Sequence, residues 1–441
     1  MSKSSGRTCL LWFVLAGALS LLGVGLIRGE LAQAQESAYL LPACSVVQYS
    51  NKLIPSPNFA ADKTLFLLTD WHRRLGVLRS MDDGETWLQV HDYSYSTGSA
   101  AFNNFEIAPT RTTTDLVFYL GVDHGDYPTG SGYFFHRTND GGNTWEQVTS
   151  PCSEHLDCPG FSLRATNRSG VVFQPRRWFF DPGLPEGVVR TADGGITWQQ
   201  VWSETAANTV AVSPNFNQDE TVFALLAGLS PTLDASFIIS HDAGETWSGG
   251  GQGLCLSYIP DLVVSPGFAR DHTLLASAYG SSLYMSQDSG LNWRSIFPPG
   301  EPYCHGSEYG AIDPQFSPGY PEDPTLYAAT GRGLYASYDA GQSWTLLVPN
   351  SASDLVVRST PEREQSRGNT PNTELLTDNV NRVYLPLTTV QGSGPPYKPH
   401  TLFMRAQITG TYDFAQYRSD DGGWTWQCMD IPAVQRQAYL P

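Results

Sequence analysis

The octet "SMDDGETW" (Ser80–Trp87) combines the residue types of a metal loop or a paired-carboxylate site. It is acidic, has glycine at its centre and closes with an aromatic residue. A calcium loop, however, presents several oxygen ligands at alternating positions and usually ends on an acidic residue. Whether the octet carries chemistry or builds the fold therefore depends on which of its residues recur.

The octet recurs six more times, at intervals of 46–58 residues followed by one interval of 82. Every copy keeps Asp third, Gly fifth and Trp eighth. The recurring aspartates are Asp82, Asp140, Asp193, Asp242, Asp288, Asp339 and Asp421. Because only one carboxylate per copy persists, we interpret it as an acceptor of backbone N–H bonds that holds a turn. We expect no metal and no other cofactor.

A second element, "SPNF" or "SPGF/Y", precedes four octets, as in "SPNFAADKT" (Ser56–Thr64). In each copy Asp stands three residues and Thr five residues after the aromatic residue. Residues 259–297 read as one unit of four short strands in which apolar and small residues alternate. Four antiparallel strands in about 50 residues, repeated, are typical of a β-propeller blade. The sequence predicts an all-β fold, a single β-propeller over residues 35–441 with seven blades of four antiparallel strands.

The long last interval leaves eight blades as an alternative. Its excess lies in a polar stretch rich in Thr, Asn and Pro, residues 350–379. We interpret this stretch as a loop and expect "RVYLPLTTV" (Arg382–Val390) to open the seventh blade. An eighth blade without an octet would instead place four strands within residues 345–380.

The octets match the pattern S-x-D-x-G-x-T-W, so the chain resembles the Asp-box, or BNR-repeat, propellers. These include sialidases, sortilin-type receptor domains and photosystem II assembly factors. A sialidase-like site would imply three arginines around a carboxylate, a Tyr–Glu nucleophile pair and an Asp acid/base. Sialidases usually carry Arg-Ile-Pro before the first box, whereas this chain has "LIP" (Leu53–Pro55) without the arginine. Arg73, Arg74, Arg176 and Arg177 carry charge, but nothing in the sequence fixes them around one centre.

Strand parity places the "SPxF" turns and the octets at one face of the ring and the remaining loops at the other. Long irregular loops on a rigid scaffold commonly bind ligands, and the alternative is ordinary solvated loops. The candidates on this face come from "TDWHRR", "GVDHGDYPTG" and "EPYCHGSEYG". They are Trp71, His72, Arg73, Arg74, Asp123, His124, Asp126, Tyr127, His305 and Glu308. His124 between two aspartates has metal-ligand chemistry, but three residues on one loop are a weak signal for a metal.

The octet tryptophans are expected to be mostly buried between blades. They are Trp87, Trp145, Trp198, Trp247, Trp293, Trp344 and Trp426. Six cysteines follow the N-terminal segment, and an even number in an exported chain favours disulfides. Cys44 precedes the first blade and Cys428 lies in the last strand, so their pairing would close the ring. The others are expected to pair Cys152 with Cys158, within "CSEHLDC", and Cys255 with Cys304.

Residues 1–34 resemble an export signal, with Lys3 and Arg7 before the apolar run Cys9–Ile27 and "AQA" as a cleavage site. The run is also long enough for an uncleaved membrane anchor. A net charge of −17 argues against nucleic acid as a partner. We predict a secreted or extracytoplasmic monomer, a binding or scaffold module for a protein, peptide or surface glycan. The alternative is a sialidase-like glycoside hydrolase.

Overall fold

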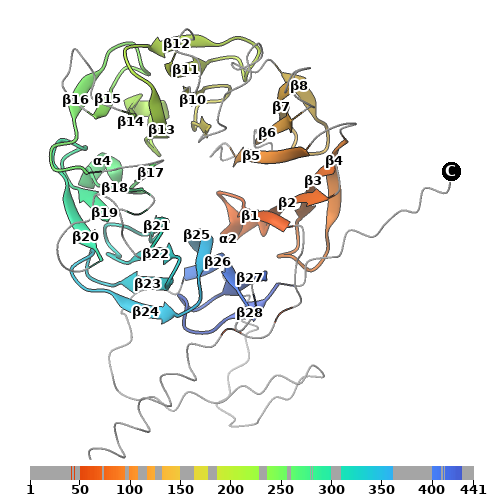
Figure 1. Cartoon of the computed structure of the whole chain (residues 1–441). Coiled ribbons are helices and arrows are strands. Elements are labelled where there is room, and N and C mark those ends of the chain that lie inside the picture. The colour runs from red at the N-terminus through yellow and green to blue at the C-terminus, as the bar shows by residue number, and fades with distance from the viewer. Residues whose placement is uncertain are drawn as a thin grey trace, which may run out of the picture.

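A computed structural model describes residues 41, 44, 50–71, 74–94, 99–107, 117–124, 132–148, 163–176, 186–227, 236–255, 260–278, 280, 282–298, 309–360, 400–408, 411 and 413–429. They form a single all-β propeller whose four-stranded antiparallel sheets surround a common centre (Figure 1). Within each sheet, the strands follow one another in chain order. Among the described residues, no helix is both long and apolar enough to cross a membrane.

Each sheet is called a blade and is numbered in chain order. Blade 1 contains β1 (Ser50–Pro55), β2 (Leu65–Trp71), β3 (Arg74–Ser80) and β4 (Leu88–Ser94). Blade 2 contains β5 (Ser99–Ile107), β6 (Val117–His124), β7 (Gly132–Thr138) and β8 (Glu146–Val148). Blade 3 contains β9 (Arg164–Ala165), β10 (Val172–Arg176), β11 (Gly187–Thr191) and β12 (Gln199–Trp202). Blade 4 contains β13 (Ala207–Val212), β14 (Val222–Leu226), β15 (Phe237–Ser240) and β16 (Ser248–Gly250).

Blade 5 contains β17 (Pro260–Val264), β18 (Leu274–Ala278), β19 (Leu283–Ser286) and β20 (Arg294–Phe297). Blade 6 contains β21 (Ile312–Phe316), β22 (Leu326–Thr330), β23 (Gly333–Ser337) and β24 (Thr345–Val348). Blade 7 contains β25 (Ala352–Ser359), β26 (His400–Gln407), β27 (Phe414–Ser419) and β28 (Gln427–Cys428). The first strand of each blade lies nearest the centre and the fourth lies at the rim (Figure 1).

The "SPxF" turns and the octets share one face of the ring, as strand parity predicts. Three of the turns contain a one-turn helix, α2 (Phe59–Asp62), α3 (Phe216–Asp219) or α4 (Phe268–Asp271), and the aromatic residue of each is buried. Backbone hydrogen bonds join the two elements directly, for example from the Asp83 N–H to the Lys63 carbonyl at 3.1 Å. The equivalent bond in blade 4 runs from Ala243 to Glu220 at 2.9 Å.

The start of the last blade differs from the sequence prediction. Blade 7 opens at β25, within the stretch expected to be a loop, and not at residues 382–390, which lie outside the described residues. β25 pairs with β26 from Ala352↔Ala406 to Ser359↔His400. The prediction was wrong because "ASDLVVRS" mixes polar and apolar residues less regularly than "RVYLPLTTV", and pairing to β26 overrides that weak local signal.

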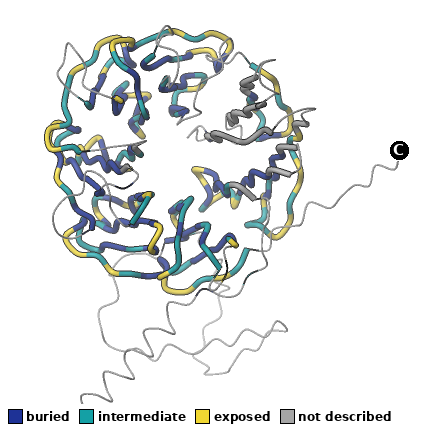
Figure 2. Tube along the Cα trace, in the orientation of Figure 1, coloured by how far each residue is buried: buried dark blue, intermediate teal, exposed yellow. Residues whose placement is uncertain are grey.

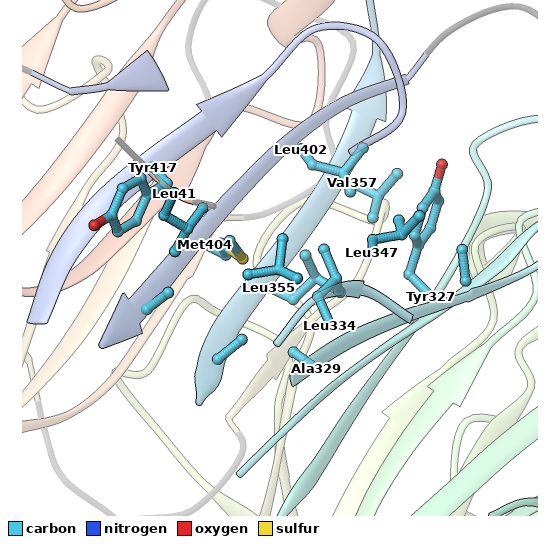
Figure 3. Packing of buried hydrophobic residues seen from close by; sticks show 14 of the residues in the cluster. Leu41, Tyr327, Ala329, Leu334, Leu347, Leu355, Val357, Leu402, Met404 and Tyr417 are labelled. Carbon is cyan, nitrogen blue, oxygen red and sulfur yellow. The ribbon is translucent and has the colours of Figure 1, made fainter. Parts of the chain in front are cut away.

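Apolar side chains form separate clusters between neighbouring blades, so the second and third strands of the blades are the most buried and exposed residues gather in the turns (Figure 2). Between blades 6 and 7, Tyr327, Leu347, Leu355 and Met404 pack in one such cluster (Figure 3). Leu41, from the segment that precedes blade 1, joins the same cluster. A blade therefore buries its faces only against its neighbours.

The prediction that the octet tryptophans are mostly buried between blades is confirmed. Trp293 is fully buried, at 7% exposure, and the other six are partly buried. Six of the seven pack in the clusters between blades. The indole N–H groups of Trp87, Trp145, Trp247, Trp293, Trp344 and Trp426 donate to backbone carbonyls, as Trp344 does to Ile296 of the preceding blade at 2.8 Å. The ring body packs against that same blade.

Arginines form a second set of contacts between blades. In four blades the residue directly before the octet is an arginine that reaches the octet of the next blade: Arg79, Arg137, Arg190 and Arg418. Blades 4, 5 and 6 carry buried Ile239, Met285 and Ala336 at that position. Arginine hydrogen bonds thus bridge the junctions that run from blade 7 through blades 1, 2 and 3 to blade 4, whereas blades 4, 5 and 6 place an apolar residue at this position.

Candidate functional site

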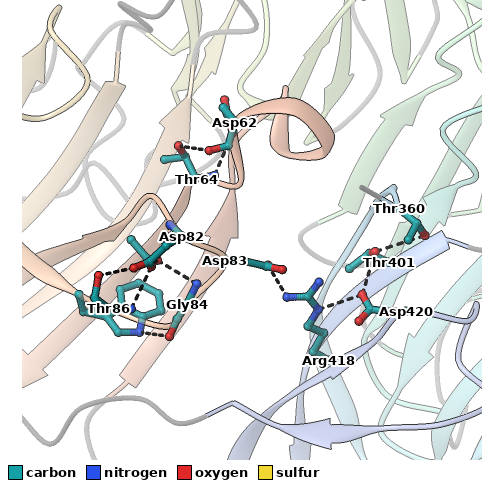
Figure 4. Close-up of polar contacts among 12 residues, drawn as sticks. Asp62, Thr64, Asp82, Asp83, Gly84, Thr86, Thr360, Thr401, Arg418 and Asp420 are labelled. Atoms are coloured by element: carbon teal, nitrogen blue, oxygen red, sulfur yellow. Dashed lines mark hydrogen bonds and ion pairs between the residues drawn. The ribbon is translucent and has the colours of Figure 1, made fainter. Parts of the chain in front are cut away.

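The octet carboxylates hold their own turns. Asp82 Oδ1 accepts hydrogen bonds from the Ser80 hydroxyl at 2.7 Å and the Thr86 N–H at 2.9 Å, and Oδ2 accepts one from the Thr86 hydroxyl (Figure 4). The Gly84 N–H donates to Ser80 Oγ at 2.8 Å, and the Trp87 indole donates to the Gly84 carbonyl at 3.0 Å. Both carboxylate oxygens are therefore occupied within the turn.

The other six octets repeat the two hydrogen bonds from the seventh residue to the Asp carboxylate, with the Asn292 amide replacing the hydroxyl in blade 5. Two features of the structure require glycine at the fifth position, namely the backbone conformation and the lack of space for a side chain. Gly290 has a φ of 90°, and a Cβ there would lie 2.2 Å from the Phe237 ring. Among the described residues, no three His, Cys, Asp or Glu side chains are arranged to hold a metal ion.

The octet hydrogen bonds lead to a pH prediction. Hydrogen bonds from the Thr86 and Thr144 hydroxyls, and then from their N–H groups, lower the pKa of Asp82 and of Asp140 to about 2. Since the folded-state pKa lies below the unfolded value, this stabilisation is complete above about pH 4 and is lost as the pH falls toward 2. We expect unfolding in that window, followed by tryptophan fluorescence.

Thr144→Val tests the cause of this acid transition. Removing the hydroxyl raises the pKa of Asp140, so the acid transition should move to higher pH. Glu85→Gln, at the exposed sixth position of the first octet, is the matched control and should leave the transition in place. A Thr144→Val transition at the wild-type pH would contradict the assignment.

The side chains of the predicted ligand-face residues lie outside the described residues. The backbone places Trp71 at the end of β2, paired with Arg74 at the start of β3, and Asp123 and His124 at the end of β6. Those strand ends lie at the face opposite the octets. His72, Arg73, Asp126, Tyr127, His305 and Glu308 are outside the described part of the chain, as is Arg177.

One predicted disulfide is present. Cys44 and Cys428 are bonded, with their Cα atoms 5.4 Å apart and 384 positions apart in the sequence. Cys255 is also disulfide-bonded. Cys152, Cys158 and Cys304 lie outside the described residues, so the other predicted pairings remain predictions.

The first strands of the blades line a central cavity of about 930 Å³. Its wall includes the charged residues Lys52, Arg164, Asp261, Asp313, Asp354 and Arg358. The three carboxylates come from neighbouring blades, namely 5, 6 and 7. The cavity therefore has one acidic side.

Asp313, in β21, is the most perturbed carboxyl group in the cavity. Its Oδ2 accepts the Leu355 N–H at 2.7 Å, and its Oδ1 accepts the Gln315 side-chain amide at 3.3 Å. Burial, followed by the negative charge of Asp261, raises the pKa of Asp313 to about 7. The Leu355 hydrogen bond and Lys52 act in the opposite direction, and Asp354 adds to the increase.

Asp261 has different surroundings. It lies on β17, and its Oδ1 is 3.8 Å from the Arg164 guanidinium of blade 3. Blade 4 lies between blades 3 and 5 in the ring, and its small residue Ala211 also lines the cavity. Asp261 faces the guanidinium of Arg164, whereas Asp313 is buried and faces the negative charge of Asp261, so the two carboxyl groups have different surroundings.

No protein-family model matches the chain. Two xyloglucanases are similar in sequence. Xgh74A from Acetivibrio thermocellus is 22% identical over 280 residues, which is 61% of this chain and 28% of the relative. A xyloglucanase from Paenibacillus sp is 22% identical over 361 residues, which is 80% of this chain and 29% of the relative. The chain thus spans less than a third of the curated relatives it matches.

Two solved structures are similar in fold. YCF48 from Cyanidioschyzon merolae has a TM-score of 0.45 and 16% identity, over 73% of this chain and 92% of that one. The GH74 xyloglucanase from Xanthomonas campestris has a TM-score of 0.38 and 14% identity, over 84% of this chain and 61% of that one.

Sequence analysis did not single out the cavity residues, although a positional signal was present. Lys52, Asp261 and Asp313 each lie four residues before the serine of an "SPxF/Y" element. Alternation along a first strand then puts that position on the side of the strand that borders the centre. An alignment of the four elements on their serines shows these three charged residues at the same position.

Proposed function

We propose that this chain is an exported glycoside hydrolase that cleaves a polysaccharide of the xyloglucan class at its central cavity. The observation that carries the proposal is the pair of unlike carboxyl groups on the cavity wall: Asp313, with a pKa of about 7, and ion-paired Asp261. Two curated xyloglucanases as sequence relatives support this proposal over the non-catalytic binding module expected from the sequence.

In the proposed reaction, Asp313 donates its proton to the glycosidic oxygen as the bond from the anomeric carbon to that oxygen breaks. Asp261 accepts a proton from the water that forms the new bond to the same carbon. The step leaves Asp313 ionised and Asp261 protonated, and exchange with solvent restores both. Glycoside hydrolysis by two carboxyl groups needs this division between an acid and a base.

The same proposal includes the family of the protein and its location. The repeated octets support membership of the Asp-box propellers, with each of the seven sheets as one blade. The disulfide between Cys44 and Cys428 supports an extracytoplasmic location.

Asp313→Asn tests the assignment. Reducing-sugar release from xyloglucan should fall about 10²–10⁴-fold, since an amide cannot donate the proton that general-acid catalysis supplies. Wild-type activity should fall as the pH rises above about 7, because the acid form of Asp313 is then lost. Asp413→Asn, at an exposed position outside the cavity, is the control and should keep wild-type activity.

Unchanged hydrolysis by Asp313→Asn would overturn the role of Asp313. If xyloglucan in the gel slows the wild-type protein in affinity electrophoresis but the protein releases no sugar, the hydrolase proposal fails. The binding module then replaces it. If it neither binds nor cleaves xyloglucan, the proposed substrate class is wrong.

A further inference from the structure

β25 carries an irregularity at the point where it faces Asp313. Its register with β26 slips between Ser353↔Arg405 and Val356↔Phe403, so two residues of β25 oppose one of β26. This is a β-bulge, which redirects the backbone groups of the extra residue. The Leu355 N–H points away from the β26 ladder and donates to Asp313 Oδ2 at 2.7 Å.

The residue that makes this bulge is Asp354, with a φ of 52°. Left-handed backbone is uncommon outside glycine, but Asp and Asn adopt it more readily than other residues. Register slips also occur in β1, β5 and β13, where Asn51, Asn103 and Asn208 are the extra residues. Among the described first strands, only β25 combines its slip with a left-handed residue.

Packing fixes the bulge in place. The Leu355 side chain is 2% exposed and packs in the cluster between blades 6 and 7 (Figure 3). Its N–H therefore has a defined direction toward blade 6. Oδ2 of Asp313 accepts this N–H and Oδ1 accepts the Gln315 amide, so both oxygens of the carboxyl group have a partner.

We propose that Asp354 is a positioning residue for Asp313: its left-handed backbone aims the Leu355 N–H at Oδ2, and its carboxylate opposes a second negative charge on Asp313. This inference rests on the proposed function for its meaning in catalysis. The charged groups that face Asp313 are Asp261 from β17, Asp354 from β25 and Lys52 from β1. Of these, Asp354 alone influences Asp313 through both charge and backbone.

Two variants separate these effects. Asp354→Asn keeps a side chain that tolerates left-handed backbone but removes the charge, so the Asp313 titration midpoint should move from about 7 toward the ordinary value of 3.8. Asp354→Ala removes the charge and also disfavours the bulge. Loss of the Leu355 hydrogen bond should then leave its midpoint above that of Asp354→Asn.

The measurement is carboxyl ¹³C NMR titration of the full chain, with the Asp313 resonance assigned by its loss in Asp313→Asn. Asp413→Asn is the control and should leave the midpoint unchanged. If Asp354→Ala fails to fold, Asp354→Gly replaces it, since glycine adopts the same φ freely and should match the Asp354→Asn midpoint.

An unmoved midpoint in Asp354→Asn would overturn the charge effect of Asp354, and equal midpoints in Asp354→Asn and Asp354→Ala would overturn its positioning of the Leu355 N–H, whatever the activity. The titration is independent of turnover, so the two proposals fail separately. A shifted midpoint in a protein that cleaves no xyloglucan would support the Asp354–Asp313 coupling and reject the hydrolase. In an active wild type, Asp354→Asn should also move the alkaline limb of the pH profile to lower pH.

Discussion

Replacing both Cys44 and Cys428 by Ser is expected to lower the free energy of unfolding by about 5 kcal/mol. The bond joins residues 384 positions apart, so it removes far more freedom from the unfolded chain than a short-loop disulfide does. It also joins the segment before blade 1 to the last strand of blade 7. Guanidinium denaturation monitored by tryptophan fluorescence gives the difference.

The surrounding contacts show what remains without the bond. Trp87 of blade 1 packs with Met429 at the end of blade 7, and Phe59 makes an edge contact with Phe403 at a centroid distance of 5.2 Å. If the double variant lost less than about 1 kcal/mol, these contacts alone would hold the ring closed. Because Cys255 is also bonded, the double variant and not a reductant is the decisive comparison.

The repeat made the fold predictable because each octet encodes a complete turn. Ser80, Asp82, Gly84 and Thr86 supply every hydrogen bond that the turn needs, so a local pattern specifies local structure. The same holds for blade 5, where the four short strands expected within residues 259–297 are β17–β20. Local consistency of this kind is what lets sequence patterns report structure.

The cavity was not predictable in the same way, because no local pattern marks it. Asp261, Asp313 and Asp354 are far apart in sequence and meet only because blades 5, 6 and 7 are neighbours in a closed ring. Asp354 moreover lies in a bulge that breaks strand alternation, the very signal by which a strand is recognised. The sequence predicted a structural role for the octet face and ligand binding at the opposite loops, whose side chains lie outside the described residues.

Arg418→Met is expected to lower the free energy of unfolding by about 3–5 kcal/mol, the usual effect of breaking a buried ion pair. The guanidinium contacts Asp83 of blade 1 and donates to Asp420 at 2.9 Å (Figure 4). Its guanidinium carbon lies 5.5 Å from the centroid of the Phe403 ring, and the side chain is only 10% exposed. Burial opposes its charge, but the Asp83 hydrogen bond and the Asp420 charge outweigh burial and raise the pKa of Arg418.

Arg79→Met is the matched control, since Arg79 occupies the corresponding position in blade 1 and donates hydrogen bonds to blade 2. It donates to the Gly141 carbonyl at 2.5 Å and to the Asn143 amide oxygen at 3.1 Å, both neutral acceptors. We expect a loss of about 1–2 kcal/mol, because these hydrogen bonds vanish without leaving a carboxylate unpaired. Equal losses in the two variants would mean that the charge of Arg418 adds nothing to the closure.

A double-mutant cycle then isolates the charge pair at the closure. Asp83→Asn suits the cycle because Asp83 has a φ of 67°, which Asn also adopts. In Arg418→Met the Asp83 carboxylate is left without its guanidinium, so adding Asp83→Asn should recover part of the lost stability. Urea denaturation of the four proteins should give a coupling energy of about 1–3 kcal/mol. Additive losses would show that Arg418 stabilises the junction through packing on Phe403 and not through Asp83.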